Sequence, residues 1–137
     1  MEDLGEAVRR LVAVCPEFSQ AWRKHLDWWD GEPAGEYNDV AALAHWIVEQ
    51  MAANNLDCFP ALFGEVETTL EAAGPRLRDL LVVGLLEDIQ NISAHGAADP
   101  DIALAFLGPE SRMGWFELIR SWHGADGTGW AGQKREE

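Results

Sequence analysis

The chain has 137 residues, of which 47% are hydrophobic and 25% are charged, as expected for one globular domain. Its 24 acidic and 10 basic residues give a formal net charge of −14 at pH 7. A domain this acidic is repelled by nucleic acid and by anionic membrane surfaces, but it attracts basic proteins. We therefore expect a basic protein partner, no nucleic acid and no membrane.

Apolar residues recur every three or four positions along the chain, and Pro and Gly separate the stripes that they form. This pattern predicts an all-α bundle of about six to seven helices. The first two helices are expected over about 2–14 and 16–29. After a loop over 31–37, Asn38 is the expected N-cap of a third helix that ends at Asn54-Asn55. A fourth helix is expected over about 56–73, with Pro60 in its first turn.

The second half of the chain begins with a helix over about 75–95 that is apolar on nearly all sides. Such a helix is normally the one around which the others pack. A short sixth helix is expected to begin at Asp99, and a seventh to span about 109–122. Short loops predict antiparallel neighbours and are compatible with stacked helical hairpins. We expect residues 1–123 to form a single helical domain and the Gly-rich residues 124–137, with Trp130, to form a disordered tail.

The two cysteines, Cys15 and Cys58, are expected to be free thiols in the core, where unpaired cysteine is common. The chain has neither a CxxC motif nor Cys/His spacings typical of zinc sites, so we expect no metal and no cofactor. Its first residues lack the basic and apolar regions of a secretory signal, and its longest near-apolar run, 80–86, is too short to span a bilayer. We therefore expect a cytoplasmic location.

The acidity is concentrated in one stretch of the sequence. Residues 25–75 contain ten acidic residues and no Lys or Arg, and so carry −10 of the net charge of −14. One interpretation is a solvated surface that maintains solubility. The other is a docking surface for a protein, because exposed aromatic residues among carboxylates are typical of binding hot spots. On that interpretation the partner-binding residues are Asp27, Trp28, Trp29, Asp30, Glu32, Glu36 and Asp39, with Tyr37 close by.

A second group of polar residues follows the apolar run of the central helix. Glu87, Asp88 and His95 are candidates for an acid/base pocket between helices, and at least one carboxylate is expected to be partly buried. The alternative is a structural polar cluster in which Gln90 and Asn91 satisfy backbone groups. HExxH, GxSxG, GxGxxG and P-loop motifs are all absent from the sequence. We therefore assign no catalytic residue and expect no enzyme.

The sequence LVVGLLEDIQN at 81–91, then LGPES at 107–111 and a helix containing Trp115, resembles a family of small bacterial all-helical domains of unknown function. Several members of that family resemble immunity proteins, which bind and neutralise a toxin. The resemblance covers about residues 59–122 and leaves the acidic half outside. We expect Gly84 to let another helix approach closely, Gly108-Pro109 to separate the last two helices, and Glu87 and Asn91 to tie the central helix to a neighbouring loop.

These observations favour a non-enzymatic acidic binding domain. The specific hypothesis is an immunity protein that covers the active surface of a cognate basic toxin, such as a nuclease, with carboxylates in place of phosphates. Two alternatives stay open. One is a small enzyme or ligand-binding protein that uses the pocket of Glu87, Asp88 and His95, and the other is a helical scaffold or oligomerisation module.

Overall fold

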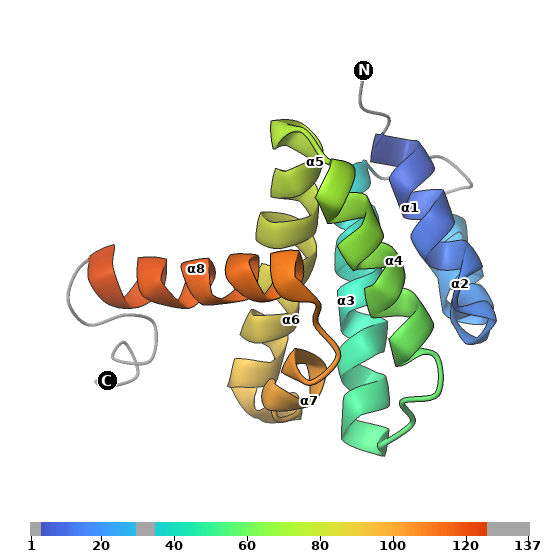
Figure 1. The fold of residues 1–137 in the computed structure, drawn as a ribbon. Helices are drawn as coiled ribbons and strands as arrows, with labels where there is room; N and C mark the ends of the chain where they lie inside the picture. Colours follow the sequence, from blue (N-terminus) through green and yellow to red (C-terminus); the bar gives the residue numbers. More distant parts are fainter. Residues whose placement is uncertain (1–3, 30–34, 126–137) are drawn as a thin grey trace.

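A computed structural model describes residues 4–29 and 35–125, and all regular structure within these ranges is helical (Figure 1). This confirms the predicted all-α fold. The helices are α1 (Leu4–Ala13), α2 (Ser19–Trp28) preceded by a 3-10 turn (Pro16–Phe18), α3 (Glu36–Ala53), α4 (Phe59–Ala72), α5 (Pro75–Asp79), α6 (Glu87–Ile92), α7 (Asp101–Leu104) and α8 (Pro109–Ala125).

Helices α5 and α6 belong to one continuous helix. A π-helical stretch, Leu80–Leu86, joins them without a break, because the residues at both junctions, Leu80 and Glu87, keep α-helical backbone angles. A second π-helical stretch, Ser93–Ala97, follows α6 and ends where Gly96 adopts a φ of 94°. We call residues 75–97 the central helix.

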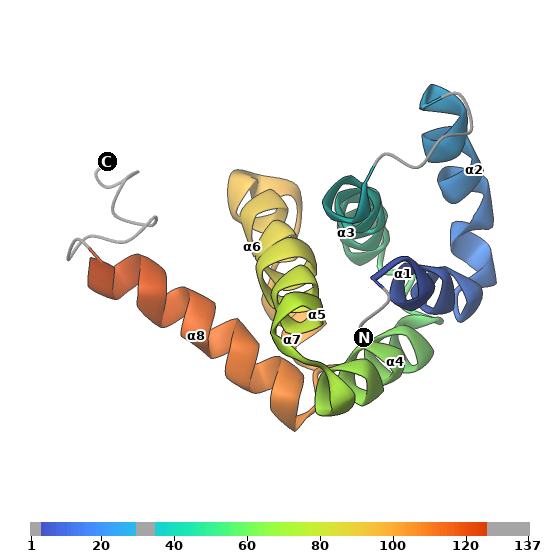
Figure 2. The ribbon, with the colours of Figure 1, turned by 90° about the horizontal axis from the view of Figure 1, so that it is seen from above.

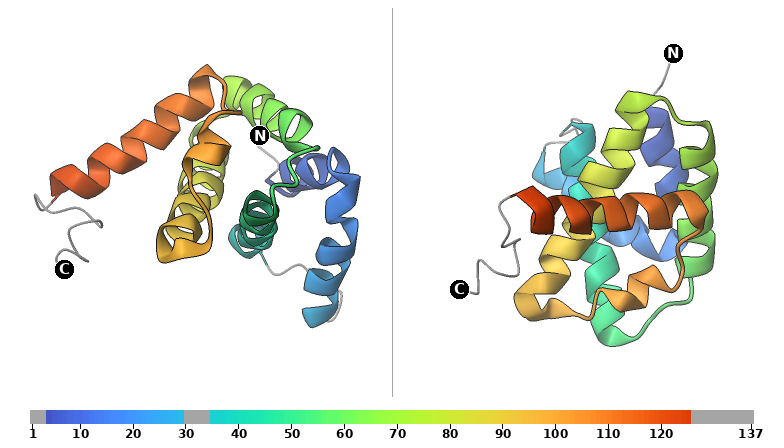
Figure 3. Two further views of the ribbon diagram at one scale, coloured as in Figure 1. Left: turned by 90° about the horizontal axis from the view of Figure 1, so that it is seen from below. Right: turned by 60° about the vertical axis from the view of Figure 1, so that its left-hand side comes forward.

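The central helix lies between α3 and α8, as its apolar sequence predicts (Figures 1 and 2). Consecutive helices from α3 to the central helix alternate in direction (Figure 1), whereas α2 lies across α3 (Figure 2). As a result, α3 and the central helix run in the same direction. Helix α4 runs in the opposite direction, from the end of α3 to the start of the central helix. Helix α8 instead lies across the central helix (Figure 3, right).

The central helix and α3 approach each other closely at Gly84. A Cβ atom on Gly84 would lie 3.1 Å from Cγ2 of Val40 and 3.2 Å from Cδ1 of Tyr37, which is tighter than normal contact. The expectation that Gly84 admits a neighbouring helix is confirmed. Around this contact the core contains the fully buried side chains Leu43, Ile47, Phe63, Leu81 and Leu85.

The first turn of α8 is held by a carboxylate from α4. Glu67 accepts hydrogen bonds from the backbone N–H groups of Glu110 (2.8 Å) and Ser111 (2.9 Å), and from the Ser111 hydroxyl (2.8 Å). The N–H groups at the start of a helix have no partners within the helix, so Glu67 caps α8 from another helix. A Cβ on Gly108 would lie 2.6 Å from Cδ of Glu67. The LGPES sequence at 107–111 therefore forms the binding site for the Glu67 carboxylate.

Two further residues fix α8 to the central helix. Arg78 donates a hydrogen bond to Glu117 at 3.2 Å and lies 3.6 Å from Glu110. The buried side chain of Gln90 donates to the backbone carbonyl of Trp115 at 3.2 Å. Gln90 thus satisfies a backbone group, as the sequence suggested for it, and in doing so ties the central helix to α8.

Several predicted boundaries need correction. Helix α3 begins at Glu36, and its N-cap is Gly35, whose φ of 101° suits glycine, rather than Asn38. Asn54 ends α3 in a left-handed conformation, as expected. Helix α8 continues to Ala125, beyond the predicted start of the tail at residue 124. Residues 126–137, which include Trp130, lie outside the described residues.

The prediction of free thiols is wrong. Cys15, in the turn after α1, forms a disulfide with Cys58, the residue before α4, and their Cα atoms lie 5.7 Å apart. The bond joins residues 43 positions apart in sequence. Two cysteines so far apart in sequence do not form a recognisable motif. The packing of α1 against α4 brings the two sulfurs together.

The Glu67 cap makes stability depend on pH. Burial raises the pKa of Glu67, but the donors from Glu110 and Ser111 outweigh it and hold this pKa below its usual 4.5. The contribution is therefore complete above pH 4.5 and is lost as the pH falls through the lower, folded-state pKa. We predict that Glu67→Ala lowers the free energy of unfolding by about 2 kcal/mol at neutral pH.

Urea denaturation at a series of pH values measures this effect. The difference between Glu67→Ala and the wild type should shrink toward acid pH. Glu71→Ala, which removes an exposed carboxylate from the same helix, should change stability by less than about 0.5 kcal/mol. A Glu67→Ala effect that stayed the same at every pH would contradict the proposed cap.

The disulfide should contribute strongly to stability, because it closes a long loop in the unfolded chain. For a separation of 43 residues the chain-entropy relation gives about 4 kcal/mol. We therefore predict that a thiol reductant lowers the urea midpoint of the wild-type protein. The double variant Cys15→Ala/Cys58→Ala is the control, and its midpoint should not respond to reductant.

Candidate functional site

The end of α2 and the start of α3 meet in a fixed corner of the fold. Nε2 of His25 in α2 lies 2.8 Å from Oδ1 of Asp39 in α3, and the two side chains are only 13% and 12% exposed. The indole of Trp22 stacks on the His25 ring at 5.4 Å between ring centroids. This polar pair, shielded by an aromatic ring, sets the position of the two helix ends relative to each other.

The surface residues beside this pair form what we call the α2–α3 corner: Asp27, Trp28, Trp29, Glu36 and Tyr37. Helix α2 contributes Asp27 and Trp28, Trp29 is its C-cap residue, and α3 contributes the other two in its first turn. The arrangement of α2 and α3 is visible from above in Figure 2.

The aromatic side chains of the corner are strongly exposed. Trp28 is 82% exposed, Tyr37 is 50% exposed and Trp29 is 42% exposed. Adjacent residues on a helix point in different directions, so at least one residue of this Trp pair is expected to face away from the core, and both are exposed. An indole that is almost fully hydrated is a large apolar surface that burial against a partner would stabilise.

The carboxylates predicted for this surface do not all lie on it. Asp27 is exposed and Glu36 is half-buried, so both are available at the corner. Asp39 is buried and bound to His25, which corrects its placement among the docking residues. Asp30 and Glu32 lie outside the described residues.

The other acids of residues 25–75 divide in the same way. Glu67 caps α8, and Glu65 accepts hydrogen bonds from Arg10 (3.2 Å) and Thr69 (3.2 Å). Asp57 and Glu71 are exposed but stand at opposite ends of α4, which is about 20 Å long. The described acids of this stretch therefore do not form one continuous patch. Part of it is used inside the fold, and part of it is spread along α3 and α4.

A cavity of about 370 Å³ lies beside the corner, between α1, α2 and α3. Its lining residues are Gly5, Val8, Arg9, Trp22, Leu26, Glu36 and Asp39. Arg9 brings a basic group to this cavity and is also paired with Glu6 at 3.0 Å. The cavity is thus lined by a cation as well as by Glu36, whereas Asp27 and Trp28 are not among its lining residues.

The described contacts do not support an acid/base pocket at the second predicted site, Glu87, Asp88 and His95. His95 uses Nδ1 to contact the carbonyl oxygen of Asn91 at 2.7 Å, within its own helix. Asp88 is half-buried near His45 of α3. Burial raises its pKa, as does the charge of Glu87, and the charge of His45 opposes them. Neither described cavity is lined by any of the three residues. The structural interpretation of this cluster is the better one.

Sequence reasoning missed the His25–Asp39 pair. The two residues are 14 positions apart, on different helices and without a motif. The available signal was the position of His25 three residues after Trp22, which places the two side chains on the same face of α2.

We predict that Asp39 acts in stability and not in binding. Asp39→Ala would leave His25 without its partner in a shielded site, so it should lower the free energy of unfolding by about 1–3 kcal/mol. The matched variant is Asp27→Ala, whose exposed side chain should change stability by less than about 0.5 kcal/mol. Chemical denaturation of both variants tests this, and equal stability of Asp39→Ala and wild type would refute a structural role.

Comparison with known proteins gives a family for this fold. Searches of curated proteins and of solved structures returned no match. Among the described helices, none is both long enough and apolar enough to cross a membrane. One family model, Domain of unknown function (DUF7674), matches residues 8–123, a range that includes the acidic stretch as well as the motifs around Gly84 and Gly108. The acidic half is thus not outside the family, and the chain belongs to the DUF7674 family of domains of unknown function.

Proposed function

We propose that this chain is a non-enzymatic binding domain that docks a basic protein through the α2–α3 corner. Within that class we propose an immunity protein that neutralises a cognate basic toxin, such as a nuclease, in the cytoplasm. The observation that carries the proposal is Trp28, which is 82% exposed and lies next to Asp27 at the end of a helix.

The exposed aromatics supply the apolar centre of such an interface. Binding energy is concentrated in a few residues, and Trp and Tyr are enriched among them because they bury a large area at a low entropic cost. Trp28, Trp29 and Tyr37 lie on two helix ends that the His25–Asp39 pair holds in place. A surface fixed in advance loses little conformational freedom on binding, which favours affinity.

The charge supplies partner selection. A net charge of −14 steers a basic protein toward this domain, and Asp27 and Glu36 place carboxylates beside the aromatics. A toxin that binds nucleic acid has a surface built for phosphates, which carboxylates can occupy. The resemblance of the 81–111 motifs to immunity-like domains supports this choice among basic partners.

The competing functions have less support. An enzyme that uses Glu87, Asp88 and His95 requires these side chains to meet at a cavity, whereas His95 binds its own helix. A scaffold or oligomerisation module would use the same exposed aromatics on a second copy of the chain. Light scattering separates that alternative from the proposal, because the proposed binding domain stays monomeric until its partner is added.

The test is co-expression with the product of the adjacent gene, followed by calorimetry on the purified pair. Trp28→Ala should weaken binding by roughly 30-fold, as expected for a hot-spot residue. The double charge reversal Asp27→Lys/Glu36→Lys should slow association and flatten its dependence on salt. The variants that bind the toxin more weakly should also protect cells from it less.

Glu71→Lys is the matched control, because it reverses an exposed acid on α4 away from the corner. It should leave affinity nearly unchanged. If Trp28→Ala and the charge reversals bind and protect as well as the wild type, the corner is not the docking surface. If Glu71→Lys loses as much affinity as the charge reversals at the corner, net charge, and not this surface, selects the partner.

A further inference from the structure

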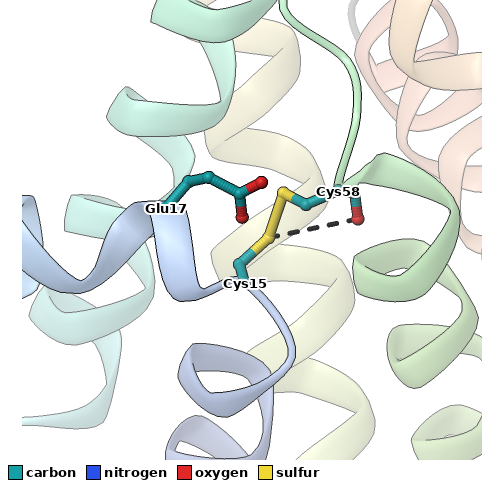
Figure 4. A group of neighbouring side chains, drawn as sticks. All are labelled: Cys15, Glu17 and Cys58. Carbon is teal, nitrogen blue, oxygen red and sulfur yellow. Dashed lines mark hydrogen bonds between the residues drawn. A yellow bond between two sulfur atoms is a disulfide. The ribbon is translucent and has the colours of Figure 1, made fainter.

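A group of three potential metal ligands lies where α1, α2 and α4 meet. Sγ of Cys15, Sγ of Cys58 and a carboxylate oxygen of Glu17 all lie within 4.8 Å of one another (Figure 4). Cys15 is buried, Cys58 is half-buried and Glu17 is exposed. We call these residues the Cys–Glu cluster. In the disulfide form the Glu17 carboxylate lies beside the bond without taking part in it.

Reduction converts this cluster into a ligand set. A dithiol reductant supplies two electrons and two protons, so that the Cys15–Cys58 bond breaks and two thiols form while the reductant becomes a disulfide. A divalent ion then displaces both thiol protons and binds two thiolates. Glu17 adds a carboxylate oxygen as the third ligand. Such a set leaves one position of a tetrahedral ion open.

The geometry of the backbone suits this exchange. The Cα atoms of Cys15 and Cys58 are 5.7 Å apart. A tetrahedral zinc ion, about 2.3 Å from each sulfur, requires the sulfurs to stand about 3.8 Å apart. Rotation of the two side chains provides this separation without movement of the helices. Sγ of Cys15 also lies 4.0 Å from the carbonyl oxygen of Cys58, so little space separates the two residues (Figure 4).

The electrostatics favour a cation there. Cys58 is the N-cap residue of the 14-residue helix α4, and its side chain makes no capping hydrogen bond. A helix N-terminus stabilises a thiolate. Two thiolates and the Glu17 carboxylate would bring three negative charges together, and a divalent ion removes most of their repulsion. Thiolate ligands select zinc over magnesium or calcium.

We propose that the reduced Cys–Glu cluster is a zinc site and that zinc binding and disulfide formation exclude each other. Glu17 also lines a cavity of about 360 Å³ together with Gln20, Lys24, Trp46 and Glu49, so this cavity adjoins the cluster. Water from this cavity completes the coordination of the ion. When a disulfide oxidant removes two electrons from the thiolates, the Cys15–Cys58 bond forms again and the zinc ion leaves.

The test uses the full chain, reduced and freed of metal under nitrogen, and titrated with Co²⁺ as a spectroscopic substitute for zinc. We expect thiolate-to-cobalt charge-transfer absorption, tetrahedral d–d bands and one ion bound per chain. Added Zn²⁺ should displace the cobalt. The oxidised chain and Cys58→Ser should show neither set of bands, and circular dichroism verifies that both are folded.

Glu17→Gln tests the third ligand. It should weaken Co²⁺ binding by more than the roughly 10- to 100-fold loss typical of an outer-shell partner. Glu49→Gln is its matched control, because Glu49 lines the same cavity outside the cluster, and its affinity should equal that of the wild type. Absence of thiolate–cobalt bands in the reduced wild type would show that the cysteines serve only as a disulfide. Equal affinities of Glu17→Gln and the wild type would remove Glu17 from the site.

Discussion

The close packing of α3 on the central helix at Gly84 determines much of this structure. Because Gly84 has no side chain, Val40 and Tyr37 can lie directly against the central helix. This contact fixes the first turn of α3, and His25–Asp39 then ties the end of α2 to it. The exposed Trp28 is therefore connected to the core through two successive contacts, one apolar and one polar. These contacts position the corner, although it stands at the edge of the bundle.

The acidic residues of this chain have two different uses, and the sequence alone cannot separate them. Glu65, Glu67 and Asp39 are bound to groups from other helices, so these carboxylates are occupied inside the fold. Asp27 and Glu36 have comparable sequence surroundings but lie at the surface. The difference arises from which helix packs opposite each carboxylate. The number of acidic residues in a sequence segment thus overstates the charge that the surface offers to a partner. The exposed aromatic residues are a better guide to the docking surface.

Much of the fold could be predicted from the sequence, because its signals are local. Pro16, Pro60 and Asn54 mark helix ends through backbone chemistry, and the apolar run at 80–86 marks the central helix. The start of α3 was misplaced because Gly35, with its positive φ, competes with Asn38 as a cap. Exposure in the Trp28–Trp29 pair followed from helical geometry alone.

The features that escaped prediction all join distant parts of the chain. Cys15 and Cys58 are 43 residues apart, and Glu67 and Ser111 are 44 apart. Neither pair has a spacing rule, because the distance between them depends on how whole helices pack. The LGPES sequence was recognised as a pattern, but its purpose becomes clear only beside Glu67. For the same reason, the predicted docking set included Asp39, whose partner His25 lies on another helix.

The π-helical stretch Leu80–Leu86 has a consequence for how this chain can change its length. Its i→i+5 hydrogen bonds hold about one residue more per turn than an α-helix does. Loss of one residue here, such as the exposed Val83, can be absorbed if the wide turns relax to ordinary α-helix. Gln90 would then still point to α8, and the α6 face would keep its neighbours. A deletion that would rotate every later side chain in a regular helix is thus accommodated locally, in the middle of the core.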